Sequence, residues 1–123
     1  MADDTFARGM KNRRLISITV IGRRSGREIT RPVWFVLQGT SVWLLPVFGS
    51  KTQWYLNLKA NRAITVHVGK ESRRLQARLR KDKSAIREVI QRFRDKYTAA
   101  EIKRWYTGLD AAVQVPIAPR AWP

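Results

Sequence analysis

The chain has 123 residues, with 25 Lys or Arg against 9 Asp or Glu, so its formal charge is +16. It has no Cys and one His, which excludes disulfides, thiol nucleophiles and zinc sites made of thiolates or several histidines. No apolar run approaches the ~20 residues of a spanning helix, so we expect one domain over 1–123, in the reducing cytoplasm, without a membrane span or a metal.

The first third of the chain shows the two-residue alternation of half-buried strands. A strand is predicted at 15–21, followed by a loop bracketed by glycines at 22–26 and a second strand at 33–37. Two strands around such a loop indicate a hairpin. A turn at 38–40 leads to a strand at 41–45, so we expect a three-stranded meander.

The middle of the chain changes period twice. Helical spacing over 52–61 predicts a short helix, with Trp54 on its apolar face and Asn61 at its end. Alternation then returns at 64–68 and 74–80, which predicts a second hairpin with one cationic, solvated face.

Two helices and a last strand are predicted near the C-terminus. Apolar residues over 86–97 recur at i, i+3, i+4 and i+7, with Asp82 as the candidate N-cap. Thr98 and Glu101 have the spacing of a capping box that opens a further helix. A strand at 113–117 completes a mainly β chain with flanking helices, an α+β fold of roughly six strands.

The positive charge requires an anionic partner or a purely solvated surface. Arg outnumbers Lys by 17 to 8, which favours planar, bidentate recognition of phosphates or carboxylates. Nucleic acid and a polyanionic small molecule both qualify. The basic residues Arg74, Arg78, Arg80 and Lys81 offer a cationic face, but the residues between them are aliphatic rather than aromatic. A surface that stacks bases needs aromatic side chains, so the sequence argues against nucleic acid.

Two loops have the composition of anion sites. The loop 22–26 offers two arginines, a hydroxyl and glycines whose amides can line a concavity, although a plain hairpin turn has the same composition. Residues 49–52 stand where a strand ends and a helix begins, a position that favours phosphate but equally suits a simple N-cap. Phosphate-loop, dinucleotide and nucleophile-elbow motifs are missing from the sequence. An enzyme of this kind would depend on an organic cofactor.

Three stretches occur together in the order found in one known family. They are ITVIGRRSGR at 18–27, RPVWFV at 31–36 and GSKTQWYLNLKAN at 49–61, followed by ITV at 64–66. From about residue 15 to 69 the chain resembles the deazaflavin-dependent nitroreductase and quinone reductase family. The resemblance implies a split β-barrel of the FMN-binding, pyridoxamine-phosphate-oxidase-like type. It also implies coenzyme F420, whose tail carries a phosphate and several glutamates.

The resemblance assigns cofactor contacts to three segments and a helix. One departure is Ile29, which stands where relatives have a basic residue. Arg31 lies on the same face of the strand and can replace that residue. The implied contacts are Arg23, Arg24, Ser25 and Gly26 at the phosphate or tail, Arg31, Pro32 and Val33 beside the deazaflavin, Gly49, Ser50 and Lys51 at the edge of the ring system, and Trp54 as a wall, with Asn57 fixing the short helix.

The acceptor side is less defined by the sequence. Trp34, Trp105 and Tyr106 are candidates for an apolar pocket over the ring, or ordinary core aromatics. Ser50 is the proton donor that the loop 49–52 supplies, with an N-cap role as the alternative. His67 is interpreted as a surface or interface residue.

The sequence thus predicts a homodimeric reductase that passes hydride from reduced F420 to a quinone-like or nitro-type small molecule. The alternatives are an FMN-dependent reductase on the same barrel, a protein that binds the cofactor without turnover, and a basic barrel that binds nucleic acid.

Overall fold

The structure is a computed structural model that describes residues 5–117. The helices and strands in chain order are α1 (Thr5–Met10), β1 (Ile16–Ile21), β2 (Glu28–Val33), β3 (Val36–Gln38), β4 (Ser41–Leu44), the 3-10 turn η1 (Gly49–Lys51), α2 (Gln53–Ala60), β5 (Ala63–Val68), β6 (Glu71–Gln76), β7 (Arg78–Arg80), α3 (Lys83–Tyr97), α4 (Ala99–Trp105) and β8 (Ala112–Pro116).

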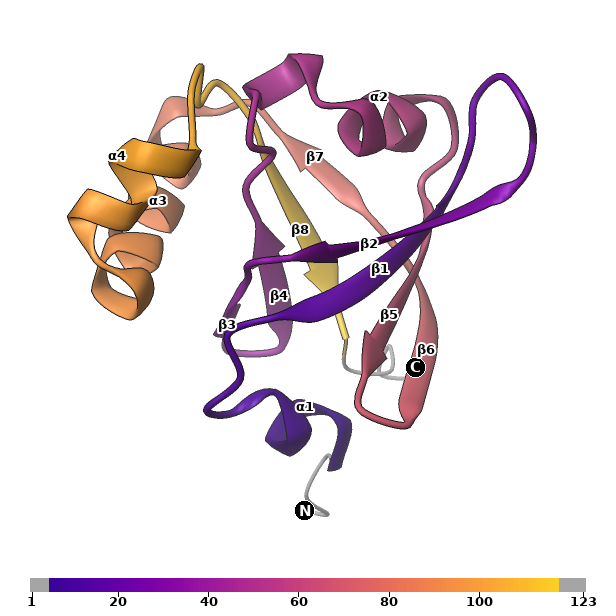
Figure 1. The fold of residues 1–123 in the computed structure, drawn as a ribbon, viewed down its shortest axis with the longest axis horizontal. Coiled ribbons are helices and arrows are strands. Elements are labelled where there is room, and N and C mark those ends of the chain that lie inside the picture. Colours follow the sequence, from indigo (N-terminus) through magenta and orange to yellow (C-terminus); the bar gives the residue numbers. More distant parts are fainter. Residues whose placement is uncertain (1–4, 118–123) are drawn as a thin grey trace, which may run out of the picture.

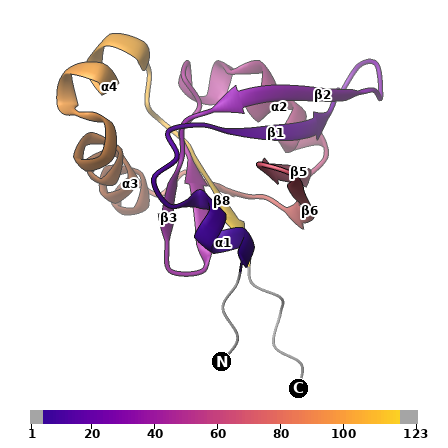
Figure 2. The ribbon, with the colours of Figure 1, turned by 60° about the horizontal axis from the view of Figure 1, so that its bottom comes forward.

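The strands form two antiparallel sheets of four. Sheet A has the order β2-β1-β5-β6, and sheet B has the order β3-β4-β8-β7. Helices α3 and α4 lie together beside sheet B, and α2 lies against β1 of sheet A, away from these two helices (Figures 1 and 2). The predicted α+β fold with flanking helices is therefore confirmed, with eight strands among the described residues in place of about six. None of the described helices has the length and apolar character needed to cross a membrane.

Two apolar cores explain the burial pattern of the strands. Ile18 and Val66 of sheet A pack with Val42 and other residues of sheet B in the core between the sheets. Trp43 points the opposite way and packs with Phe93 and other residues of α3 and α4 in a second core. Sheet B is therefore covered on both faces, which is why all four residues of β4 are buried.

The outer face of sheet A is polar. Thr19 Oγ1 lies 2.7 Å from Thr30 Oγ1 and 2.6 Å from His67 Nε2, and His67 Nδ1 lies 2.6 Å from Ser72 Oγ. This chain of hydrogen bonds crosses all four strands of the sheet. His67 thus lies at a half-buried surface position, as the sequence predicted.

The predicted strand at 33–37 is wrong. Strand β2 ends at Val33 in sheet A and β3 begins at Val36 in sheet B, so Trp34 and Phe35 carry the chain between the sheets. The run looks continuous in sequence because Phe35 belongs to the core between the sheets and Val36 to the core under the helices. The three-stranded meander is wrong for the same reason.

The second predicted hairpin is divided in a similar way. Strands β5 and β6 pair as expected, but the strand predicted at 74–80 breaks at Ala77. The amide of Ala77 donates to the Arg62 carbonyl oxygen (2.8 Å), and β7 then joins sheet B beside β8. The single run of alternating apolar residues at 74–80 is therefore divided between the two sheets.

The three predicted helices and the last strand are confirmed within one or two residues. Asp82 is the N-cap residue of α3 by position, although its side chain makes no capping hydrogen bond. Thr98 Oγ1 accepts from the Glu101 amide (3.2 Å), which is half of the expected capping box. The helix α1 was not predicted, because six residues are too few to show a period.

At Gly49 the backbone passes very close to the backbone of Gly108, and a substitution can test this contact. The φ of Gly49 is +60°, and an added Cβ would overlap the Gly108 carbonyl oxygen and Asp110 Oδ1. Gly39 has nearly the same φ of +61° but nothing within 4 Å of an added Cβ. We expect Gly49→Ala to lower the free energy of unfolding by about 3 kcal/mol and Gly39→Ala by about 1 kcal/mol. Urea unfolding of both variants measures the difference, and equal losses would show that the contact with Gly108 is not tight.

Candidate functional site

A pocket of about 810 Å³ runs between the loop after β1 and the end of α4. These two segments lie on opposite sides of the ribbon in Figure 1. Its lining includes residues from β2 of sheet A, Trp34 at the crossover to β3, and residues from the segment 45–48, which follows β4. Ten of the fourteen predicted cofactor-binding and pocket residues line it, together with Asn57: Arg23, Arg24, Ser25, Arg31, Pro32, Val33, Trp34, Trp54, Trp105 and Tyr106.

Arg23 is fixed by the short helix α2. Its guanidinium donates to Asn57 Oδ1 (2.7 Å) and Gln53 Oε1 (3.0 Å), and its backbone amide also donates to Asn57 Oδ1 (3.1 Å). Asn57 is 5% exposed, so its oxygen is an anchor protected from water. The sequence predicted that Asn57 fixes the helix, and the structure shows that it also holds the loop after β1.

The other two arginines of the pocket are less engaged. Arg24 makes no hydrogen bond or ion pair within residues 5–117, and Arg31 donates only to the neighbouring Thr30 carbonyl oxygen (2.9 Å). Ile29, Arg31 and Val33 all line the pocket, as expected for alternate residues of one strand. The guanidinium groups of Arg24 and Arg31 are therefore available to an anion.

The loop after β1 closes on itself at its tip. Gly26, with φ +72°, donates from its amide to the Gly22 carbonyl oxygen (2.9 Å), and the Arg27 amide donates to Ser25 Oγ (3.1 Å). Gly26 does not line the pocket. Its place in the turn requires a residue that adopts positive φ easily.

The far end of the pocket is apolar and partly open to solvent. Leu15, Phe48 and Trp105 are the exposed large hydrophobic residues of the described chain, at 51%, 61% and 56%, and all three line this pocket. Sequence analysis missed Leu15 and Phe48. Both lie outside the helices and strands, so no helical or strand period marks them.

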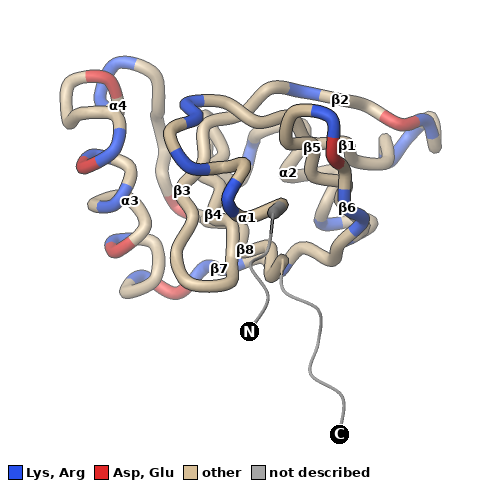
Figure 3. Tube along the Cα trace, turned by 90° about the horizontal axis from the view of Figure 1, so that it is seen from below, with Lys and Arg blue, Asp and Glu red and all other residues tan. Residues whose placement is uncertain are grey.

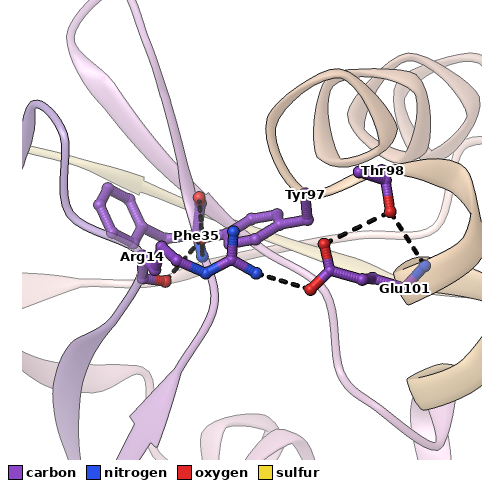
Figure 4. A network of polar contacts seen from close by, with 5 residues as sticks. All are labelled: Arg14, Phe35, Tyr97, Thr98 and Glu101. Carbon is purple, nitrogen blue, oxygen red and sulfur yellow. Dashed lines mark hydrogen bonds and ion pairs between the residues drawn. The ribbon is translucent and has the colours of Figure 1, made fainter.

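Trp34 forms a wall that is held from behind by Tyr97 and Arg14. Its ring stacks on Tyr97 with centroids 4.3 Å apart, and the Arg14 guanidinium lies 5.5 Å from the centre of the indole. Arg14 is itself paired with Glu101 (2.7 Å), the residue whose amide is bonded by Thr98 (Figure 4). Trp34 and Tyr106 are thus both core and lining residues, so the two readings of these aromatics do not exclude each other.

Gly49, Ser50 and Lys51 lie outside the lining, in the turn η1. Ser50 donates from its amide and from its hydroxyl to the two carboxylate oxygens of Asp110, both at 2.7 Å. The Ser50 hydrogen bonds lower the pKa of Asp110. Thr52, not Ser50, is the N-cap residue of α2. Cofactor contact by Gly49, Ser50 and Lys51 therefore stays a prediction.

The electrostatics of the pocket are uniformly positive. Its described lining contains Arg23, Arg24 and Arg31 and no Asp or Glu. Of the described acidic residues, Glu88, Asp95 and Glu101 lie on α3 and α4, and the others are spread over the rest of the molecule (Figure 3). The other titratable side chain in the lining is Tyr106, whose pKa is raised because burial disfavours the phenolate. Within residues 5–117 no three His, Asp or Glu side chains group as a metal site would require.

Solved structures support the same fold. An F420-H2 dependent reductase (FDR-A) has a TM-score of 0.66 and 21% identity, over 84% of this chain and 94% of that one. A structure described as a domain-swapped dimer has the same score and identity, over 84% and 80%. A putative pyridoxamine 5'-phosphate oxidase from Listeria innocua has a TM-score of 0.66 and 13% identity, over 91% and 90%. These likenesses show the pyridoxamine-phosphate-oxidase-like split barrel.

No curated protein matches the chain significantly in sequence. A family model described as F420H(2)-dependent quinone reductase matches residues 3–117. That span contains both sheets, the arginine loop and every pocket residue described above. The chain therefore belongs to the F420H(2)-dependent quinone reductase family of oxidoreductases, whose cofactor is coenzyme F420.

Proposed function

We propose that the large pocket binds reduced F420 and that the chain reduces a small quinone-like or nitro-type acceptor there. The observation that carries the proposal is the division of one pocket into a cationic end without carboxylates and an apolar end with indole and phenol rings. A flat ring system with a polyanionic tail requires both ends.

The residues present fit such a cofactor. We assign Arg24, Arg31 and Ser25 to the phosphate and the carboxylates of the tail, because their polar groups line the pocket and are exposed. Arg23 differs in its role: its hydrogen bonds to Asn57 and Gln53 position the loop, and its charge adds to the local field. We assign Trp34, Trp54 and Val33 to the walls beside the ring.

The cofactor, when bound in its reduced form, supplies hydride chemistry. The chain contributes binding and the exclusion of water. Trp34 is held rigidly by its stack on Tyr97, and Tyr106 remains protonated because burial raises its pKa. Ser50 is the sequence-based candidate for a proton donor, but its hydroxyl proton is directed to Asp110. We therefore assign the proton to solvent and Ser50 to the positioning of the loop.

We also propose that the protein forms a homodimer and functions in the cytoplasm. The exposed Leu15, Phe48 and Trp105 supply apolar surface that a second copy can bury. A structure similar to this chain is described as a domain-swapped dimer, which supports the same assembly. The outer face of sheet A, by contrast, carries the hydrogen-bonded polar side chains of Thr19, Thr30 and His67.

The first prediction from this proposal concerns the contact between Arg24 and the acidic tail of F420. Arg24→Ala should weaken F420 binding about 10- to 100-fold at low salt, because a charge-assisted contact contributes about 1.5–3 kcal/mol. Arg27→Ala is the matched control, since Arg27 is an exposed arginine of the same loop outside the lining. Fluorescence titration with F420, with its tail-less deazaflavin core and with FMN measures all three affinities. Equal weakening by both variants, or preference for FMN, would contradict the assignment.

The second prediction concerns Ser50. Ser50→Ala should lower the free energy of unfolding by about 1 kcal/mol, because Asp110 loses the hydroxyl hydrogen bond. The rate of menadione reduction at saturating cofactor should stay unchanged. Both quantities are measured on the same preparation. A slower rate with an unchanged unfolding midpoint would assign the proton to Ser50 after all.

The third prediction concerns assembly. Light scattering at micromolar concentration should give twice the chain mass of 14.3 kDa. The measurement belongs at moderate salt, because a net charge of +16 opposes association of two copies. Phe48→Ser combined with Trp105→Ser should shift the equilibrium to the monomer. A double variant with the parent's mass would place the contact elsewhere.

A further inference from the structure

A second, smaller pocket of about 430 Å³ lies where the end of α1 meets β3 and α3. Its apolar lining comes from Met10 and from 35–37. It is separate from the F420 pocket, because no residue lines both. The division falls between two neighbours in the chain: Trp34 lines the large pocket and Phe35 the small one.

Lys96 is the distinctive group of this second pocket. Its Nζ donates to the Phe35 carbonyl oxygen (2.9 Å) and lies 3.4 Å from the centre of the Phe35 ring. No described carboxylate forms an ion pair with it. Burial, together with the charge of Arg14, lowers the pKa of Lys96 to about 8. A half-buried ammonium without a counter-ion is stabilised by an anion that enters beside it.

The remaining charges of the lining add to this preference. Lys11 and Arg92 are exposed cations of the same pocket, and Asp95 is its one acidic residue among the nine that line it. Asp95 accepts a hydrogen bond from Gln91 Nε2 (3.0 Å), so its carboxylate is directed along α3. Arg92 forms an ion pair with Glu88 (3.3 Å), so Lys96 and Lys11 against Asp95 leave the pocket positive.

We propose that this pocket is a second binding site, which takes a small monocarboxylate with an apolar or aromatic group. The carboxylate lies at Lys96, with Arg92 and Lys11 at the rim, and the apolar group packs against Phe35 and its neighbours in β3. The volume of the pocket exceeds that of a benzoate-sized molecule, and its mixture of apolar surface with a few convergent polar groups is typical of ligand sites.

The site has a physical connection to the F420 pocket. The Phe35 carbonyl oxygen that accepts from Lys96 also lies 2.9 Å from the Tyr97 hydroxyl, and the Tyr97 ring supports Trp34. A ligand that draws Lys96 away from this carbonyl therefore acts on residues in contact with the wall of the larger pocket. The binding proposal itself does not depend on what the larger pocket binds.

The test is a titration of the full chain with benzoate, monitored by ¹H-¹⁵N correlation spectra. A parallel titration with benzamide, the neutral isostere, shows whether the charge is needed. We expect amide shifts at 10–12, 35–37 and 92–96, with benzoate bound at least about tenfold more tightly than benzamide. Lys96→Met should weaken binding about tenfold or more. Lys83→Met is the matched control, because it removes an exposed lysine of the same helix outside the pocket.

Two further variants keep the result unambiguous. Lys96→Gln replaces Lys96→Met if the methionine variant gives a poorly dispersed spectrum. Arg24→Ala should weaken anion binding in the larger pocket, whereas the shifts at 35–37 should persist in this variant. The proposal is overturned if these shifts are absent, if they vanish in Arg24→Ala, if benzamide binds as well as benzoate, or if the Lys96 variants bind like the parent.

Discussion

The chain must pass from sheet A to sheet B at Phe35, where the peptide group has no strand partner. A buried N–H and C=O cannot be left unbonded. The Tyr97 hydroxyl accepts from the Phe35 N–H (3.0 Å) and lies 2.9 Å from its carbonyl oxygen, which also accepts from Lys96. The same hydroxyl lies 2.8 Å from the Arg14 carbonyl oxygen, as Figure 4 shows. Burial raises the pKa of Tyr97 to about 12, so the hydroxyl keeps its proton at physiological pH. One side chain thereby fixes the crossover, the position of α3 and the wall at Trp34.

Sequence patterns predicted the elements whose periods are long or whose ends carry a chemical signal. The helix α3 follows from its apolar period, and the start of α4 follows from Thr98 and Glu101. The patterns failed where one apolar run serves two cores, as at 33–37 and at Ala77. Alternation reports that a residue is buried, not which sheet buries it. The change of sheet depends on Tyr97, more than sixty positions away in the chain, and no local pattern contains that information.

The candidate site also contains some residues that the sequence predicted and others that it could not predict. The arginine loop and the aromatic residues were predicted because charge, glycine spacing and a family resemblance all mark them. The engagement of Arg23 by Asn57 and the rim residues Leu15 and Phe48 depend on tertiary contacts. The charge of the pocket is also a tertiary property. The sequence has 9 acidic residues, but none of the described ones lines the pocket. Glu88 and Glu101 are paired with Arg92 and Arg14 instead.

Strand β8 bears on how the molecule is assembled during synthesis. It lies inside sheet B, between β4 and β7, and pairs Ser41 with Pro116 across most of the chain. The strands of sheet A all come from the first 76 residues and can pair while translation continues. Until Ala112–Pro116 leaves the ribosome, β4 has one open edge and β7 has no strand partner. The arginine end of the pocket therefore belongs to a part of the chain that can fold early. The apolar end, which includes Trp105 and Tyr106, forms later, after α4 has been synthesised.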